Sequence, residues 1–318
     1  MDKNIIVPEY SDIQEAHERI KKIIHNTPVL SSQSINEIFN AHFFFKCDNF
    51  QKVGAFKFRG ACNAVFSLPE KEAQKGVATH SSGNHAAALS LAAKIRGIKA
   101  YIVMPENAPQ IKKKAVLGYG GIITFCKPTL VARETTLEKI IKETGAVFVH
   151  PYNSFNVVCG QGTAAKELLE EIPDLDIIIA PVGGGGMLSG SAITAKAINP
   201  DIKVVAGEPK NADDAYRSFK SGKLIPSENP DTIADGLLTS LSPLTFSIIM
   251  NKVDEIFTAT ERSIIDAMRM VWERMKIIIE PSSAVPLAAI MENREYFKGK
   301  KIGIIVTGGN LDLESLPF

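Results

Sequence analysis

The chain has no excess of charge of either sign and no long apolar run. Its 36 basic and 35 acidic residues leave a net charge of +1 over 318 residues, which removes the electrostatic basis for binding nucleic acid or an anionic membrane. No apolar stretch reaches the ~20 residues needed to cross a bilayer, and the opening MDKNIIVPEYSD carries no secretory hydrophobic segment. We therefore expect a cytoplasmic protein whose partners are small molecules.

Cysteine is also scarce, and the common nucleotide motifs are incomplete. Cys47, Cys62, Cys126 and Cys159 form no CxxC pair and no zinc-like spacing, so we expect free thiols in a reducing compartment. A glycine-rich segment lacks the GK[ST] of a Walker motif, and Leu188 or Ser189 stands where GxGxxG needs its third glycine. This disfavours a nucleotide-binding oxidoreductase, which stays as an alternative together with an inactive regulatory binding protein.

Short runs rich in β-branched residues alternate with longer helical patterns. The strand-like runs are FFFK near 43, GVATH at 76, AYIVM at 100, GIITF at 121, DIIIAPV at 176, KVVAGEP at 203 and KIGIIVTGG at 301. This alternation predicts an α/β fold with mainly parallel sheets covered by helices on both faces. We expect a large domain of residues 1–68 and 149–318, with a small domain of residues 69–148 inserted in it.

Four consecutive glycines, Gly183 to Gly186, separate a strand-like run from a helical pattern in PVGGGGMLSGSAITAKA. Such a segment folds into a concave nest whose N–H groups, with a helix dipole behind them, bind a phosphate without any cationic side chain. The alternative interpretation is a flexible glycine loop.

A second segment, THSSGNHAAALSLAAKIRG, places Ser81, Ser82, Gly83 and Asn84 between a strand and an alanine-rich helix. Free N–H groups at a helix start suit a carboxylate, the group that every amino-acid substrate carries. Taken alone, ordinary helix capping explains the pattern better, and His85 is more typical of a structural hydrogen-bonding residue.

A lysine lies among apolar residues and glycines in NFQKVGAFKFRGACNAV, where Lys57 stands between Phe56 and Phe58. An ammonium group in apolar surroundings loses solvation, so its pKa falls and the neutral amine becomes available for a Schiff base. Most lysines are solvated surface charges, so this interpretation needs support from elsewhere in the chain.

A fourth segment, KIGIIVTGGN, ends a strand with Thr307, whose hydroxyl can hydrogen-bond a heterocyclic nitrogen.

Together these segments meet the binding needs of pyridoxal 5'-phosphate (PLP) and an amino acid: an amine, a phosphate nest, a carboxylate site and a hydroxyl for the ring nitrogen. The chain resembles the serine racemase and threonine/serine dehydratase family of fold-type II PLP enzymes. The resemblance runs through TPVL, FQKVGAFKFRGA, THSSGNHA, CGQGTAAKE, VGGGGMLSG, GEPKNADDAY, TIADG, ERMKIIIEPS and TGGN. It implies a tryptophan synthase β-like fold with two doubly wound, mainly parallel sheets.

The resemblance also implies a role for each residue of the site. The implied cofactor contacts are Lys57, Phe56, Asn84, Gly183, Gly184, Gly185, Gly186, Met187 and Thr307, and the implied substrate-carboxylate contacts are Ser81, Ser82, Gly83, Asn84 and His85. Lys57 forms the Schiff base and Asn84 meets the 3'-oxygen of the ring. Thr307 stands near the pyridine nitrogen, and a neutral hydroxyl there leaves that nitrogen unprotonated, which favours prompt loss of a β-leaving group.

Ser82 bears on the type of reaction, because threonine-type dehydratases commonly carry alanine at this place. In serine racemases the counterparts of Lys57 and Ser82 transfer protons on opposite faces of the reacting carbon. The resemblance therefore implies a serine racemase with L-serine and L-threonine dehydratase (ammonia-lyase) activity. A threonine dehydratase or a threo-3-hydroxyaspartate dehydratase without racemase activity stays open, because one methyl group changes discrimination by only ~1 to 3 kcal/mol.

The segment KVVAGEPKNADDAY resembles the divalent-cation site of serine racemases. The carboxylates of Glu208 and Asp214 with the carbonyl of Ala212 suit Mg²⁺, Ca²⁺ or Mn²⁺. A solvated acidic turn is the alternative.

Two further properties follow from the resemblance alone. Some members of the family are activated by ATP, and that pattern is only partly kept here, since Ser32, Lys52 and Asn310 match whereas Val53 and Tyr152 do not. Activation by ATP therefore stays open. A homodimer is also implied.

Overall fold

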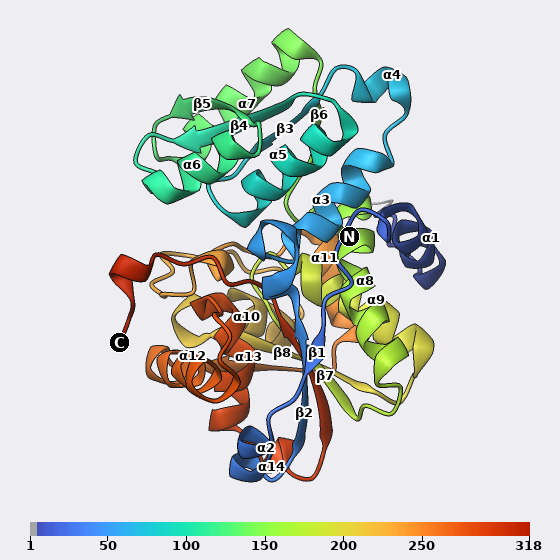
Figure 1. The fold of residues 1–318 in the computed structure, drawn as a ribbon, viewed down its shortest axis with the longest axis vertical. Coiled ribbons are helices and arrows are strands. Elements are labelled where there is room, and N and C mark those ends of the chain that lie inside the picture. The colour runs from blue at the N-terminus through green and yellow to red at the C-terminus, as the bar shows by residue number, and fades with distance from the viewer. Residues whose placement is uncertain (1–4) are drawn as a thin grey trace.

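The computed structural model describes residues 5–318, which form a six-stranded and a four-stranded sheet, each with helices on both faces (Figure 1). The larger sheet has the strand order β1-β2-β10-β7-β8-β9. Only β1 runs antiparallel to its neighbour. The strands are β1 (Val29–Leu30), β2 (His42–Cys47), β7 (Ile177–Pro181), β8 (Lys203–Pro209), β9 (Glu255–Ala259) and β10 (Lys301–Val306).

The smaller sheet is wholly parallel and has the order β5-β4-β3-β6. Its strands are β3 (Val77–His80), β4 (Ala100–Pro105), β5 (Ile122–Cys126) and β6 (Val147–Phe148). The two parallel sheets confirm the predicted fold class, and each of the predicted runs forms a strand. All four strands of the smaller sheet lie within residues 69–148, although the exact domain boundaries stay a prediction.

The helices connect the strands and cover both sheets. They are α1 (Tyr10–Ile20), α2 (Gln33–Phe39), α3 (Lys57–Phe66), α4 (Glu70–Ala73), α5 (Asn84–Arg96), α6 (Gln110–Gly118), α7 (Leu130–Thr144), α8 (Phe155–Glu171), α9 (Gly186–Ile198), α10 (Asp214–Ser221), α11 (Pro243–Lys252), α12 (Glu261–Met275), α13 (Pro281–Glu292) and α14 (Arg294–Phe297).

Strand β7 shows why the central runs are apolar throughout. Ile177 and Ile179 face one hydrophobic cluster, whereas Ile178 and Ala180 face another on the opposite side of the sheet. The first cluster includes residues of α12 and α13, and the second includes residues of α8 and α9. Because both faces are buried, a parallel strand at the centre has no polar side.

The topology brings distant segments together at the carboxyl end of β10. Ala55 forms a bridge with Gly308, and the N–H of Phe56 donates to the carbonyl of Thr307 at 2.9 Å. These contacts place the start of α3 beside the end of the large sheet. The carboxyl ends of parallel strands next to helix N-termini are the usual ligand-binding edge of such folds.

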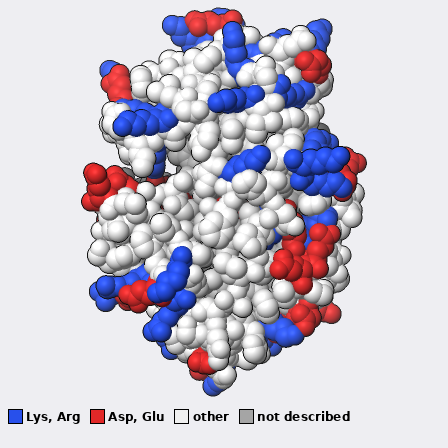
Figure 2. Space-filling view, in the orientation of Figure 1, with Lys and Arg blue, Asp and Glu red and all other residues white. Residues whose placement is uncertain are grey.

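The surface in Figure 2 carries basic and acidic side chains that are interspersed, with broad uncharged areas between them. Within residues 5–318, no helix is both long enough and apolar enough to span a membrane.

Candidate cofactor and substrate site

Lys57 is the first residue of α3, and its amine is poorly solvated. Its Nζ donates to the carbonyl of Pro151 at 3.4 Å and lies 4.8 Å from the centre of the Phe56 ring. Burial lowers the pKa of Lys57 to about 8, although the nearby Glu280 carboxylate acts in the opposite direction. A lysine of this pKa has a populated neutral form near physiological pH, which a Schiff base requires.

The tetraglycine bend connects β7 to α9. None of the backbone N–H groups from Gly183 to Leu188 donates a hydrogen bond to another group in the described part of the chain. Gly185 has φ +83°, a conformation that favours glycine. A Cβ on Gly184 would lie 2.3 Å from the ring of Tyr152. The bend is therefore a set of free N–H donors at a helix start, in a place where side chains do not fit.

A second set of free donors lies at the start of α5. A Cβ on Gly83 would meet nothing within 4 Å, so this residue faces open space. Ser81 Oγ accepts from the N–H of Gly83 at 3.4 Å. The partly buried Ser82 makes no hydrogen bond through its hydroxyl within residues 5–318. A carboxylate fits this open helix start, and the Ser82 hydroxyl is free to act on a bound molecule.

Asn84 and Asn310 converge on a carboxylate that we did not predict. The amide of Asn84 donates to both oxygens of Glu280, at 3.1 and 3.2 Å, and its oxygen accepts from the amide of Asn310 at 2.9 Å. Burial, with a smaller contribution from the charge of Asp235, raises the pKa of Glu280 to about 7. A protonatable carboxyl group thus lies close to Lys57.

Thr307 is buried, and its hydroxyl lies 2.9 Å from that of Ser283, a second residue that we did not predict. Ser283 Oγ also accepts from the N–H of Gly308 and donates to its carbonyl, both at 2.7 Å. Ser283 therefore fixes the position of the Thr307 hydroxyl at the end of β10.

Two histidines near the amine are held neutral. His85 Nε2 lies 3.0 Å from the carbonyl of Val149, so that nitrogen carries the proton. Burial, with a smaller contribution from the charge of Lys57, lowers the pKa of His85 to about 3. Burial also lowers the pKa of His150 to about 4. Neither imidazole is a proton donor of the kind that general acid catalysis needs at neutral pH, and His85 makes the expected structural hydrogen bond.

The predicted metal ligands lie between the end of β8 and the start of α10. Glu208 accepts from the N–H groups of Ala215 and Tyr216, at 2.8 and 2.7 Å. Neither carboxylate oxygen of the buried Asp214 has a hydrogen-bond partner in the described residues. Burial raises the pKa of Glu208 well above its usual value and that of Asp214 to about 6. In residues 5–318 no group of three or more His, Cys, Asp or Glu side chains is placed to hold a metal, so a cation here would need the carbonyl of Ala212 and water.

The residues of the partial ATP pattern do not lie at one site: Asn310 and Val53 are in contact, whereas Tyr152 is elsewhere. Asn310 donates to the carbonyl of Val53 at 2.6 Å. Tyr152 lies against the glycine bend instead. Next to Asn310 is an open groove lined by Asn49, Phe50, Gly54, Lys276, Ile277, Ile278, Gly309 and Asn310.

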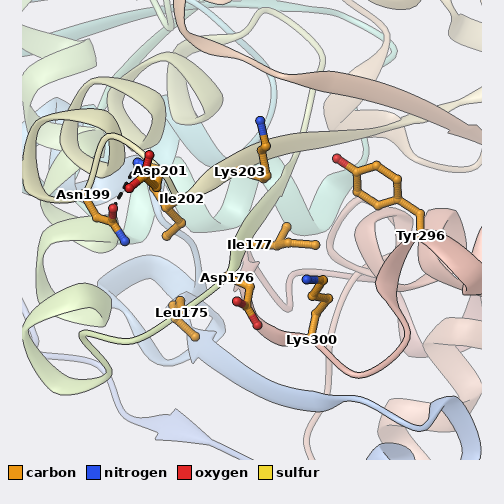
Figure 3. Close-up of a pocket in the computed structure, with 9 residues that line it drawn as sticks. All are labelled: Leu175, Asp176, Ile177, Asn199, Asp201, Ile202, Lys203, Tyr296 and Lys300. Atoms are coloured by element: carbon orange, nitrogen blue, oxygen red, sulfur yellow. Dashed lines mark hydrogen bonds between the residues drawn. The ribbon is translucent and has the colours of Figure 1, made fainter.

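A further cavity lies at the amino ends of β7, β8 and β10, at the opposite end of the sheet from Thr307 (Figure 3). It brings together none of the predicted site residues. Its lining residues are Leu175, Asp176, Ile177, Asn199, Asp201, Ile202, Lys203, Tyr296 and Lys300.

Comparison with known proteins gives the chemistry that this site serves. Residues 20–308 match the family model described as pyridoxal-phosphate dependent enzyme. The chain is 54% identical over 312 residues to a beta-hydroxyaspartate dehydratase from Paracoccus denitrificans, with 98% of this chain and 99% of the relative covered. It is also 54% identical to a serine racemase from Dictyostelium discoideum, with 96% and 95% covered.

Solved structures agree with these matches. The structure of maize serine racemase superposes with a TM-score of 0.96 at 47% identity, covering 97% of this chain and 95% of that one. The matches lend no support to a nucleotide-binding oxidoreductase. The chain belongs to the family of pyridoxal-phosphate-dependent enzymes, in the group that contains the serine racemases.

Proposed function

We propose that this enzyme racemises serine and dehydrates L-serine and L-threonine, with Lys57 and Ser82 as the two proton-transferring groups. The observation that carries the proposal is the free hydroxyl of Ser82 at the open start of α5, in the same site as an amine of lowered pKa. The relatives named serine racemase support it.

The residues of the site fit PLP. The N–H groups from Gly183 to Met187 have no acceptor in the described part of the protein, as a phosphate site requires. We propose that they hold the phosphate, that Lys57 binds the aldehyde and that Thr307 faces the pyridine nitrogen, with Phe56 and Asn84 beside the ring. When bound, the cofactor supplies the sink for the electron pair left at the α-carbon after deprotonation.

Lys57 and Ser82 then account for both products. With cofactor and substrate bound, the amine of Lys57 would be free to take the α-proton. If Ser82 donates its hydroxyl proton to the opposite face of the α-carbon, D-serine results. If instead the ammonium of Lys57 returns its proton to the departing β-hydroxyl, water leaves, and hydrolysis yields the keto acid and ammonia. The N–H groups of Ser82, Asn84 and His85, which donate to nothing else in residues 5–318, would orient the carboxylate during both routes.

A second candidate is dehydration of 3-hydroxyaspartate. Arg133 on α7 has a buried Nε without a partner in residues 5–318. Burial lowers the pKa of His80, the last residue of β3, and the nearby charge of Arg133 acts in the same direction. Since β3 leads into Ser81 and Ser82, we propose that this guanidinium binds the second carboxylate of the substrate. The Paracoccus relative named beta-hydroxyaspartate dehydratase agrees with this candidate.

We further propose that Glu208, Asp214 and the carbonyl of Ala212 hold Mg²⁺ or a similar hard cation, because two buried carboxylates of raised pKa lie together there. A homodimer and a cytoplasmic location are also proposed. The four cysteines are all free and buried, as is usual in a reducing compartment. Activation by ATP stays open.

Product analysis tests the proposal directly. The purified enzyme is incubated with L-serine, L-threonine and the hydroxyaspartates, and both the keto acid and the D-enantiomer are measured. Formation of D-serine together with pyruvate from L-serine supports the proposal. Keto-acid release from hydroxyaspartate alone, with no D-serine, supports the second candidate instead.

A further inference from the structure

The two proposed attachment points of the cofactor lie at the starts of two different helices. Lys57 is the first residue of α3, and Gly186 is the first residue of α9. Helix α8 packs against both helices and lies between their chain segments in Figure 1. A shift of α8 relative to either helix would therefore change the distance between Lys57 and the glycine bend.

Helices α3 and α8 touch through backbone. A Cβ on Gly160 of α8 would lie 2.6 Å from both the carbonyl oxygen of Arg59 and the Cα of Gly60. In addition, Gln161 Oε1 accepts from the N–H of Gly60 at 3.2 Å. Carbon atoms in ordinary contact are about 3.5 to 4.0 Å apart, so a methyl group at Gly160 would push α3 away by about 1 Å. Gly60 is one helical turn from Lys57.

The contact between α8 and α9 has the same character. A Cβ on Gly190 of α9 would lie 2.5 Å from the backbone nitrogen of Gly162 and 2.6 Å from the carbonyl of Val158. Gly190 is one helical turn from Gly186, where the bend enters α9. Small residues on opposite sides of α8 thus bring both neighbouring helices to backbone contact.

Arg59 ties α3 to α8 through buried ionic contacts. Its Nη1 and Nη2 donate to the two carboxylate oxygens of Glu167 on α8, at 2.7 and 2.8 Å. Its Nε and Nη2 donate to the carboxylate of Asp48, at 2.7 and 2.9 Å. Thr163 on α8 accepts from Nη1 at 3.2 Å. Because Arg59 is fully buried and its planar group is satisfied on two sides, α3 has little freedom to slide along α8.

We propose that α8 is a spacer that sets the distance between Lys57 and the tetraglycine bend to the length of PLP, with Gly160, Gly190 and Arg59 as positioning residues. The inference rests on the proposed binding of the aldehyde by Lys57 and of the phosphate by the bend. A ligand held at both ends gains affinity from the linkage only when the two half-sites are correctly spaced. Linkage of two half-sites raises affinity by about 10²-fold or more, and this gain is lost when the spacing prevents both ends from binding at once.

The experiment compares a linked ligand with its two halves on cofactor-free protein. The variants are Gly160→Ala and Gly190→Ala. The probes are PLP, pyridoxal, which has the aldehyde without the phosphate, and inorganic phosphate. PLP affinity is measured by absorbance, phosphate affinity by calorimetry, and pyridoxal attachment by borohydride trapping and mass spectrometry.

In both variants we expect PLP to bind about 10²-fold more weakly, because the linkage between the two half-sites is lost. Phosphate affinity and pyridoxal attachment should change by no more than about twofold, because each half-site keeps its own geometry. Unchanged PLP affinity overturns the proposal, and so does a loss for PLP that phosphate or pyridoxal shares equally.

A matched control separates spacing from crowding. A Cβ on Gly121, in the small-sheet region, would lie 2.4 Å from Ser90 Oγ and 2.7 Å from Val116, so Gly121→Ala is similarly crowded but remote from α8. This control should lower the melting temperature and leave PLP affinity unchanged. If the Gly160→Ala and Gly190→Ala variants do not fold, Arg59→Lys keeps the charge and loses the paired contacts, and the same pattern of PLP, phosphate and pyridoxal binding is expected from it.

Wild-type protein shows whether the underlying assignment holds. If it attaches no pyridoxal at Lys57 or binds no phosphate that competes with PLP, the proposed site is wrong. Suppose that wild type attaches pyridoxal at Lys57 and binds phosphate, and that every variant still binds PLP as tightly as wild type. The site is then right and the spacer role is wrong.

Discussion

The side-chain amide of Asn84 donates to both carboxylate oxygens of Glu280, at 3.1 and 3.2 Å. Asn84 is the first residue of α5, which packs on the small sheet, whereas Glu280 is the N-cap of α13, which packs on the large one. The pair therefore joins the two sheet regions beside Lys57. It also keeps a carboxyl group of raised pKa inside the site.

Glu280 should make stability depend on pH. Its pKa is raised to about 7 in the folded protein, so the folded state binds the extra proton and stability falls as pH rises from its usual pKa through about 7. The change is on the order of 3 kcal/mol over this window. In Glu280→Gln the pH dependence of the unfolding free energy should shrink by about this amount, as measured by urea unfolding of cofactor-free protein across the window.

The exposed Glu138 provides the control, because Glu138→Gln should keep the wild-type dependence. A wild-type slope in Glu280→Gln would show that other carboxyl groups, such as Asp214, account for the effect.

The reactivity of Lys57 should follow its lowered pKa. Only the neutral amine attacks an aldehyde, so the rate of reaction with PLP should reach half its maximum near pH 8, as the pKa of about 8 requires. In Glu280→Gln the midpoint should move to lower pH, because the carboxylate raises the pKa of Lys57. Stopped-flow absorbance over a pH series gives both values, and a midpoint near the usual lysine pKa would contradict the poorly solvated environment.

Ser82→Ala should separate the two proposed reactions. Loss of the second proton donor should reduce D-serine formation by about 10²-fold or more, whereas pyruvate formation should persist, because Lys57 still removes the α-proton. Chiral chromatography and a keto-acid assay on the same samples measure both rates. Ser81→Ala is the comparison: its hydroxyl accepts from the N–H of Gly83 in the proposed carboxylate site, so D-serine and pyruvate formation should fall together. If D-serine formation survives in Ser82→Ala, another residue reprotonates the substrate.

Divalent cations should stabilise the protein through Asp214. Ligand binding to the folded state raises the melting temperature, so Mg²⁺ should raise it in wild type and a chelator should lower it. Asp214→Asn keeps the shape and removes the charge, and its melting temperature should not respond to Mg²⁺. An equal response in this variant would place the cation elsewhere.

Arg133 should discriminate between substrates with one and two carboxylates. If it binds a second carboxylate, Arg133→Gln should reduce kcat/KM for hydroxyaspartate by about 10-fold or more and change that for serine by less than about threefold. Lys139 on the same helix is exposed, and Lys139→Gln serves as the charge control. Parallel losses for both substrates would assign Arg133 a structural role.

The sequence was sufficient to predict seven of the ten strands in residues 5–318 and the glycine bend, because these leave local signals, whereas β1, β6 and β9 were not predicted. Ile177 to Ala180 are apolar on both faces, and four adjacent glycines have few structural explanations. The segment after β3 was similarly visible, with serines and a glycine at a helix start.

Glu280, Ser283 and Arg59 left no such signal. Glu280 and Ser283 read locally as an ordinary start of a helix in EPSS, and only the fold brings them to Asn84 and Thr307. In the local sequence Arg59 looks like a surface arginine. The fold buries it between η1 (Asp48–Phe50) and α8, where it pairs with Asp48 and Glu167, and Lys46 of β2 pairs with the same Glu167. Such partners are far apart in the chain, so their contacts depend on tertiary packing.

The most direct test of the account is reduction of the PLP-loaded enzyme with borohydride, followed by peptide mass spectrometry. We predict a reduced cofactor label on Lys57 that persists when other lysines are mutated, and no label in Lys57→Arg. A label on any other side chain, or none in wild type, would contradict the central claim.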